Sequence, residues 1–255
     1  DLSDLKDRSE RIRWGRKARA YLVHLFTASG VAFAFLAMAE VVQPDLDPRW
    51  VFGWLTLAVF IDAADGPLAR LWDVKLYASR ILGGTIDEIV DYLTFTFIPL
   101  VLVWRMDWLP DPDGLWVVLA MVASLLGFAN TSAKQAQEGF FLGFPSYWNV
   151  VAYYVGLLTV EYGAAGAYFS LGSVLLLTVL TLVPVRFVYP NRAPKPWRVV
   201  VIVGGIVWLG VLLALLPAFP ELPAWGGDWV LWVSFVYPAF YFGLSGWLDW
   251  TSRQA

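Results

Sequence analysis

The chain has 255 residues and a net charge of −3; 59% of its residues are hydrophobic and 15% are charged. Soluble globular domains are about 45–50% apolar and about 25% charged, so this composition excludes an ordinary soluble domain and predicts an all-α integral membrane protein. The sequence contains no cysteine and one histidine, which excludes disulfides, thiolate metal sites and multi-histidine metal clusters. It carries no nucleic-acid-binding motif, and its basic residues follow the loops of a membrane topology.

Residues 1–20 form a charged arm ahead of the first apolar stretch. Its basic residues are interspersed with Leu5, Ile12 and Trp14, a pattern that predicts an amphipathic helix lying at the membrane interface on anionic headgroups. The alternative is that the arm is only the positive charge that sets the topology. The chain therefore divides into this arm and a membrane domain, residues 21–255.

Eight apolar stretches of about twenty residues follow, each long enough to cross the hydrocarbon core of a bilayer. Proline, glycine and charged residues separate most of them, but only the short run 163–166 separates the fifth from the sixth. The eight predicted transmembrane helices are residues 21–42, 51–71, 84–104, 114–131, 147–166, 168–189, 198–219 and 229–249.

Positive charge is distributed unevenly between the two sides of this predicted topology. Sixteen Lys and Arg residues fall on the side of both termini, and only Arg49 and Arg105 fall on the other. Because cytoplasmic loops carry the excess of Lys and Arg, we expect both termini to be cytoplasmic.

Four aspartates lie inside apolar stretches, near the cytoplasmic ends of the second and third predicted spans: Asp62, Asp65, Asp87 and Asp91. Their spacings of three and four put each pair on one face of a helix, so two neighbouring helices can present four carboxylates to one point. Carboxylates at this depth are costly unless they are compensated. The best compensation is a pair of divalent cations, the usual device for phosphoryl transfer. Ion pairs with neighbouring arginines, or a proton or cation relay, are the alternatives.

The residues around these aspartates read DAADGPLAR and GGTIDEIVD. They resemble the D-x-x-D-G-x-x-A-R and G-x-x-x-D-x-x-x-D signature of the CDP-alcohol phosphotransferase family, and all eight signature positions are matched. The resemblance implies that an alcohol hydroxyl attacks the β-phosphate of a CDP-linked substrate and releases CMP. It also implies two divalent cations, Mn²⁺ or Mg²⁺, as cofactors.

The resemblance further implies a role for each signature residue. Asp62, Asp65 and Asp87 would hold metal, and Asp91 would contact the second ion and act as the general base. The residues that would line the CDP and diphosphate pocket are Gly66, Ala69, Arg70 and Gly83, with Thr27 and His24 of the first span as further candidates.

Three further segments, VHLFTASG, GFPSYWNVVAYY and PVRFVYP, resemble a choline-using bacterial branch of the family. That branch implies CDP-diacylglycerol and choline as substrates, and a bacterial inner membrane with the active site on its cytoplasmic side. Quaternary ammonium groups bind to aromatic faces, so the candidate choline-binding residues are Glu138, Tyr147, Trp148 and Asn149. An aromatic belt at the membrane interface is the simpler interpretation of the same segment.

The family resemblance leaves the acceptor alcohol open. A sister enzyme that uses serine, inositol or a phosphorylated alcohol would share the whole signature, and a basic cluster that includes Arg186 and Lys195 could bind an acceptor phosphate or simply set the topology. A cation or proton transporter is the remote alternative. Homodimers are common in the family, and the extra helices of an eight-span chain leave its own pairing open.

Overall fold

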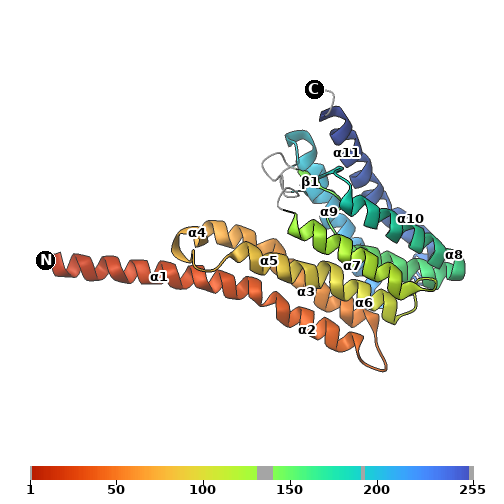
Figure 1. The fold of residues 1–255 in the computed structure, drawn as a ribbon, viewed down its shortest axis with the longest axis horizontal. Helices are drawn as coiled ribbons and strands as arrows, with labels where there is room; N and C mark the ends of the chain where they lie inside the picture. Colours follow the sequence, from red (N-terminus) through yellow and green to blue (C-terminus); the bar gives the residue numbers. More distant parts are fainter. Residues whose placement is uncertain (1, 131–139, 191–192, 253–255) are drawn as a thin grey trace.

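The computed structural model describes residues 2–130, 140–190 and 193–252, which form a helical bundle with one short two-stranded sheet (Figure 1). Within these described residues, five helices are long and apolar enough to cross a membrane. The predicted class of helical membrane protein is confirmed, whereas the number of eight spans stays a prediction. The five helices are Glu10–Val41, Pro48–Leu71, Trp148–Leu182, Lys195–Ala218 and Gly227–Thr251.

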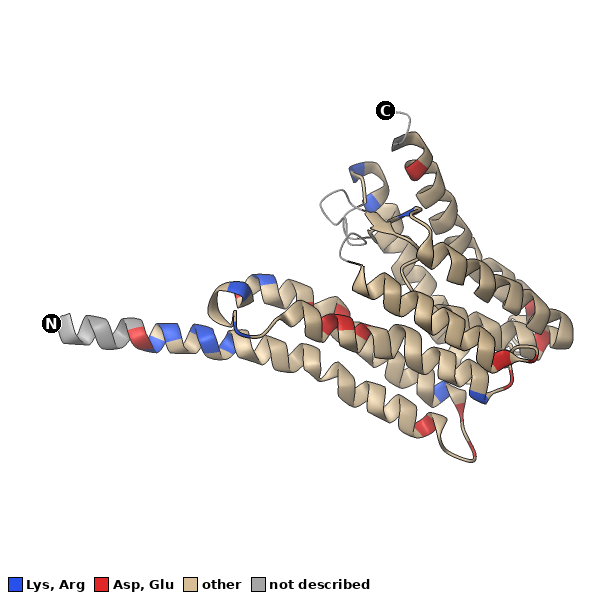
Figure 2. Ribbon diagram, in the orientation of Figure 1, with Lys and Arg blue, Asp and Glu red and all other residues tan. Residues whose placement is uncertain are grey.

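The arm continues into the first span without a break, because α1 (Leu2–Ala28) is a single helix. Its first part extends beyond the bundle in line with the rest of the helix, and basic residues lie along it (Figures 1 and 2). Ser29 separates α1 from α2 (Gly30–Val41), and the Ser29 hydroxyl donates to the carbonyl of Phe26 at 2.6 Å. The position of the arm at a membrane interface stays a prediction.

The third predicted span contains a change of helix type directly after Asp91. Pro99 has no backbone N–H to donate to the carbonyl four residues before it, and a π-helical turn, which bonds to the fifth residue instead, accommodates that loss. The elements of the second and third predicted spans are α3 (Pro48–Leu71), α4 (Val74–Tyr77), α5 (Gly83–Asp91), the π-helical η1 (Tyr92–Phe97) and α6 (Ile98–Arg105).

The fifth and sixth predicted spans lie in one element, α8 (Trp148–Leu182). Gly163 interrupts it with a φ of 56° and a ψ of −133°, a conformation that glycine adopts without steric cost. A side chain at Gly166 would overlap the backbone carbonyl of Leu158, although eight residues of straight helix span about 12 Å. The chain therefore folds back here, and the two limbs on either side of Gly163 form a hairpin.

The sixth predicted span extends too far. The helix ends at Leu182, and β2 (Arg186–Val188) follows and pairs antiparallel with β1 (Phe140–Leu142). Pro184 cannot donate to a helical ladder, so the apolar run continues as extended chain. The prediction of helix to residue 189 is wrong, and the sheet was not predicted.

The C-terminal helices pack against one another and against α8. A Cβ atom at Gly204 would lie 2.9 Å from Cε2 of Tyr237, so the glycine lets the two helices approach closely. The indole N–H of Trp208 donates to the hydroxyl of Tyr154 at 3.0 Å. The remaining elements are α7 (Asp113–Ala129), α9 (Lys195–Leu215), the 3-10 turn η3 (Leu216–Ala218), α10 (Gly227–Ser234) and α11 (Val236–Ser252).

Candidate active site

Three of the four signature aspartates come together in the structure. Asp62 on α3 and Asp87 and Asp91 on α5 each offer a carboxylate oxygen, and these oxygens lie within 4.8 Å of one another. All three side chains are half-buried, and the acidic residues of α3 and α5 gather in the same part of the bundle (Figure 2). We call these three residues the aspartate triad.

Asp65 lies outside the triad. It is buried, with 8% of its surface exposed, and its carboxylate shares a hydrogen bond with the side chain of Thr27 on α1. The Thr27 hydroxyl is also 3.2 Å from the carbonyl of Val23, so two acceptors lie within its reach. The structure thus brings together two residues that were assigned from the sequence to different roles, metal binding and nucleotide binding.

The small residues of the signature lie against protein groups. A Cβ atom at Gly83 would be 2.9 Å from the ring of His24, which is buried and hydrogen-bonded through Nε2 to the carbonyl of Ala78 at 3.3 Å. Ala69 packs against the small apolar cluster that includes Ala78. Gly66 is covered by the Arg70 guanidinium, which would lie 3.5 Å from an added Cβ, and the rest of Arg70 is exposed.

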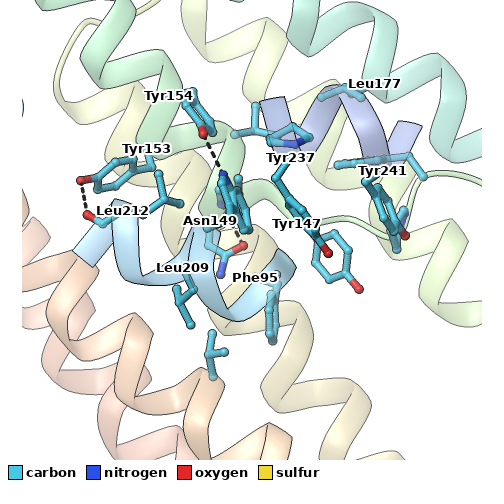
Figure 3. Close-up of a pocket in the computed structure, with 18 of the residues that line it drawn as sticks. Phe95, Tyr147, Asn149, Tyr153, Tyr154, Leu177, Leu209, Leu212, Tyr237 and Tyr241 are labelled. Carbon is cyan, nitrogen blue, oxygen red and sulfur yellow. Dashed lines mark hydrogen bonds between the residues drawn. The ribbon is translucent and has the colours of Figure 1, made fainter. Parts of the chain in front are cut away.

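A cavity of about 940 Å³ opens beside the aspartate triad, and all three carboxylates line it. Tyr147 and Asn149, predicted to bind choline, also line it. Tyr147 lies close enough to Asp62 and Asp91 for their charges to act on its phenol. Figure 3 shows Tyr147 and Asn149 beside residues of α9 and α11 at the cavity wall.

Of the two other predicted choline ligands, the structure describes only Trp148, which does not line the cavity. Trp148 is completely buried, and its indole N–H donates to the hydroxyl of Ser124 at 2.6 Å. Glu138 lies outside the described residues.

Several cavity tyrosines were not singled out from the sequence, and two of them lie on α11. Tyr237 and Tyr241 of α11 lie near Tyr147 (Figure 3), and their hydroxyls donate to the carbonyls of Val201 at 2.7 Å and of Val188 at 2.8 Å. Because these bonds hold the hydroxyls at the protein wall, the rings are fixed in place. The only signal in the sequence is their spacing of four, which puts both on one face of a helix.

The comparisons with known proteins agree with this geometry. No family model matches the chain. It is 36% identical to the phosphatidylcholine synthase of Pseudomonas aeruginosa over 234 aligned residues. These residues are 91% of the chain and 92% of that protein. The chain belongs to the family of bacterial phosphatidylcholine synthases. The resemblance to CDP-alcohol phosphotransferases is thereby confirmed.

Two further phosphatidylcholine synthases match most of the chain. The protein of Bradyrhizobium diazoefficiens is 36% identical over 215 residues, which are 82% of the chain and 75% of that protein. The protein of Agrobacterium fabrum is 32% identical over 213 residues, which are 81% of the chain and 83% of that protein.

This family implies a divalent metal ion, and the donor set of the aspartate triad fits one. Carboxylate oxygens are the ligands that Mg²⁺ and Mn²⁺ prefer in proteins. Three carboxylates within 4.8 Å of one another in a half-buried site also repel one another strongly, and a bound cation would relieve that repulsion. The triad is therefore suited to hold a metal ion at the wall of the cavity.

Proposed function

We propose that the protein is a phosphatidylcholine synthase that transfers the phosphatidyl group of CDP-diacylglycerol to choline and releases CMP. One observation carries the proposal: the aspartate triad borders a cavity lined by tyrosines, in a chain 36% identical to the Pseudomonas aeruginosa phosphatidylcholine synthase over 92% of that protein. This arrangement supports the proposal of a phosphoryl-transfer centre next to a site for an organic cation.

Two divalent cations, Mn²⁺ or Mg²⁺, are the proposed cofactors. Asp62, Asp87 and Asp91 are proposed to hold them, with Asp65 as the fourth ligand. When bound, the ions would neutralise the diphosphate and stabilise the charge that moves to the leaving CMP. Asp65 shares its hydrogen bond with Thr27 in this structure, so its contact with an ion requires that bond to be given up.

Asp91 is the proposed general base. Its carboxylate lies at the cavity and at the end of α5, where the acceptor hydroxyl would meet the diphosphate. The choline oxygen forms the new bond to the β-phosphorus, the bond from that phosphorus to the oxygen of CMP breaks, and Asp91 takes the hydroxyl proton. Proton transfer to a positioned carboxylate contributes about 10²–10⁴-fold to a rate.

The CDP moiety is proposed to bind on the exposed side of the triad. Arg70 is exposed and lies over Gly66, so its guanidinium is free to turn toward a phosphate oxygen. Ala69, Gly83 and Thr27 contribute to this pocket indirectly, because they fix α1 and α4 against the signature helices.

Choline is proposed to bind between Tyr147 and the two tyrosines of α11, with Asn149 at the same wall. The trimethylammonium group would face the tyrosine rings, each worth about 0.5–2 kcal/mol, while its hydroxyl points to Asp91. A phosphorylated acceptor is less suited to the site, because Arg186 lies 3.9 Å from Asp249 and covers the ring of Phe140.

The chain is proposed to cross the inner membrane of a bacterium eight times, with both termini and the aspartate triad on the cytoplasmic side. The excess of Lys and Arg on that side supports this orientation, and the exposed basic residues of α1 would contact anionic headgroups. Choline would enter from the cytoplasm and CDP-diacylglycerol from the bilayer. The mass of the protein in detergent or nanodiscs tests whether it forms a homodimer.

The test is CMP release by the purified protein with CDP-diacylglycerol and Mn²⁺. Choline is compared with serine, ethanolamine, inositol, inositol phosphate and glycerol phosphate. We expect release with choline alone. Release with a different alcohol would keep the role of the triad but reject the choline pocket, and no release with any acceptor would reject the proposed function.

A further inference from the structure

The cavity beside the aspartate triad is larger than choline, the proposed acceptor, requires. Its volume of about 940 Å³ is near the upper end of the roughly 300–1,000 Å³ that encloses drug-sized ligands, and choline is far smaller than such a ligand. Most of the space therefore serves another part of the reaction.

The shape of the cavity follows the helices that line it. On α9 the lining residues run from Val201 to Leu213, a length of about 18 Å at 1.5 Å per residue. On α3 they run from Asp62 at the triad to Phe52, a length of about 15 Å. The cavity is thus an elongated groove with the carboxylates at one end, which we call the α9 groove.

The wall of the α9 groove beyond the triad is apolar. Both limbs of α8 contribute leucines to it, Leu158 and Leu177. The hydroxyls of Thr56 and Ser173 donate to carbonyls of their own helices, at 2.7 and 3.0 Å, so their protons are already used. The exception is Ser170, whose buried hydroxyl lines the groove without a hydrogen-bond partner among the described residues. Such a wall suits a hydrocarbon chain.

Aromatic rings meet at the far end of the groove. The lining residues Phe52 and Tyr153 both contact Phe219 behind them, with ring centroids 5.0 and 4.6 Å apart. The groove therefore has a defined length from the triad to this aromatic contact, and a chain that enters at the triad end meets a floor.

We propose that the α9 groove holds one acyl chain of the lipid substrate, an inference that rests on the proposed function. The diphosphate of the lipid would lie at the triad, where the groove begins. One leaflet of the hydrocarbon core is about 15 Å deep, which equals the length of α3 from Asp62 to Phe52. The second acyl chain stays in the bilayer.

The groove affects selectivity between acyl chains of different length rather than the overall affinity for the lipid. Moving an acyl chain from the bilayer to an apolar protein wall gains no hydrophobic free energy, because both surroundings are hydrocarbon. The groove instead limits how far the acyl chain can enter it. This limit sets the position of the diphosphate relative to the aspartate triad. Chain length should therefore affect turnover.

The test introduces a bulky ring into the groove and compares lipids of different length. Leu209→Trp on α9 and Ser173→Trp on α8 alter lining residues, while Val207→Trp is the matched control on a side chain that is 62% exposed and does not line the groove. CMP release is measured with dioctanoyl and dioleoyl CDP-diacylglycerol at saturating choline.

We expect both groove variants to lower kcat/KM for the dioleoyl lipid by about tenfold relative to the dioctanoyl lipid, since overpacking an occupied apolar space has a cost of this order. The Val207→Trp control should keep the wild-type ratio. An unchanged ratio in both folded groove variants, or an equal loss on both lipids, would overturn the proposal. Failure of the wild-type protein to turn over either lipid would instead reject the proposed function.

A second readout does not depend on turnover. CDP-diacylglycerol with a photoreactive diazirine at the end of one acyl chain should label the far end of the groove, around Phe52 or Leu212, when it is bound to the wild-type protein. Labelling confined to the exposed outer faces of the helices would contradict the assignment even if activity were normal.

Discussion

Removing one charge from the aspartate triad should stabilise the metal-free protein while it abolishes the response to metal. At an effective dielectric constant of about 20, two unit charges 4.8 Å apart repel by about 3.5 kcal/mol. Each carboxylate takes part in two of the three repulsions. Because the side chains are only half-buried, screening reduces the relief from Asp87→Asn to about 1–2 kcal/mol.

For a chain of this size, a change of 1 kcal/mol moves the melting temperature by about 2–4 °C. In EDTA, Asp87→Asn should therefore melt about 2–8 °C above the wild type. Adding Mn²⁺ should raise the Tm of the wild type but not that of the variant. The assay is thermal unfolding in detergent, followed by intrinsic tryptophan fluorescence.

The matched control is Asp73→Asn, which removes the same formal charge outside the triad. Asp73 is exposed and has a φ of 47°, a conformation that asparagine tolerates well. It should leave the Tm in EDTA and the response to Mn²⁺ unchanged. The reasoning fails if Asp87→Asn melts at or below the wild type in EDTA, or if Mn²⁺ still stabilises it.

Four further predictions concern single residues. Asp62→Ala should abolish CMP release and leave the protein folded, as judged by its Tm and gel-filtration profile. Asp91→Asn should lower kcat by at least about 10²–10⁴-fold with little change in the choline KM, because it removes the carboxylate that takes the hydroxyl proton and also helps to hold an ion. Tyr237→Leu should raise the choline KM about fivefold, a loss of roughly 1 kcal/mol of cation–π attraction, and Tyr237→Phe should not. Gly166→Ala should lower the Tm, because its Cβ would overlap the carbonyl of Leu158, whereas Gly172→Ala on the same limb has open space and should not.

Each of these has a clear contrary result. Full turnover by Asp62→Ala would remove that residue from the metal site, and full turnover by Asp91→Asn would remove the general base. Equal choline KM values for the leucine and phenylalanine variants of Tyr237 would argue against ring contact with the ammonium group. A stable Gly166→Ala protein would contradict the tight hairpin of α8.

The aspartate cluster was predictable because two signals agree. One is the helical spacing of the aspartates, and the other is the free-energy cost of carboxylates at membrane depth that nothing compensates. Carboxylates three and four residues apart on two apolar helices leave few stable arrangements. That argument brought all four to one point, and three of them, Asp62, Asp87 and Asp91, meet. The position of Asp65 was not predictable in the same way. Its hydrogen bond to Thr27 depends on how α1 packs on α3, which is tertiary information.

The choline side of the cavity was harder to predict, because it too depends on tertiary contacts. In a chain with fifteen Trp and eleven Tyr, a local cluster of aromatic residues does not distinguish a binding wall from a packed core. Trp148 and Tyr147 are neighbours in the sequence, yet one bonds to Ser124 in the core and the other lines the cavity. Tyr237 reaches the same cavity from a distant helix.

Secondary structure was predictable where hydropathy and turn residues agreed. The glycine-rich run 163–166 located the fold-back of α8, because a φ of 56° at Gly163 and a close backbone contact at Gly166 both need glycine. The helix was extended too far into residues 183–189 because an apolar run does not distinguish a helix from the short strand β2.

The central claim is that the aspartate triad transfers a phosphatidyl group to choline. The most direct test incubates the purified protein with CDP-diacylglycerol, isotopically labelled choline and Mn²⁺, and measures labelled phosphatidylcholine and CMP by mass spectrometry, with Asp87→Asn in parallel. We predict equimolar phosphatidylcholine and CMP from the wild type and neither product from the variant. Equal product from both proteins, or CMP without labelled phosphatidylcholine, would contradict the account.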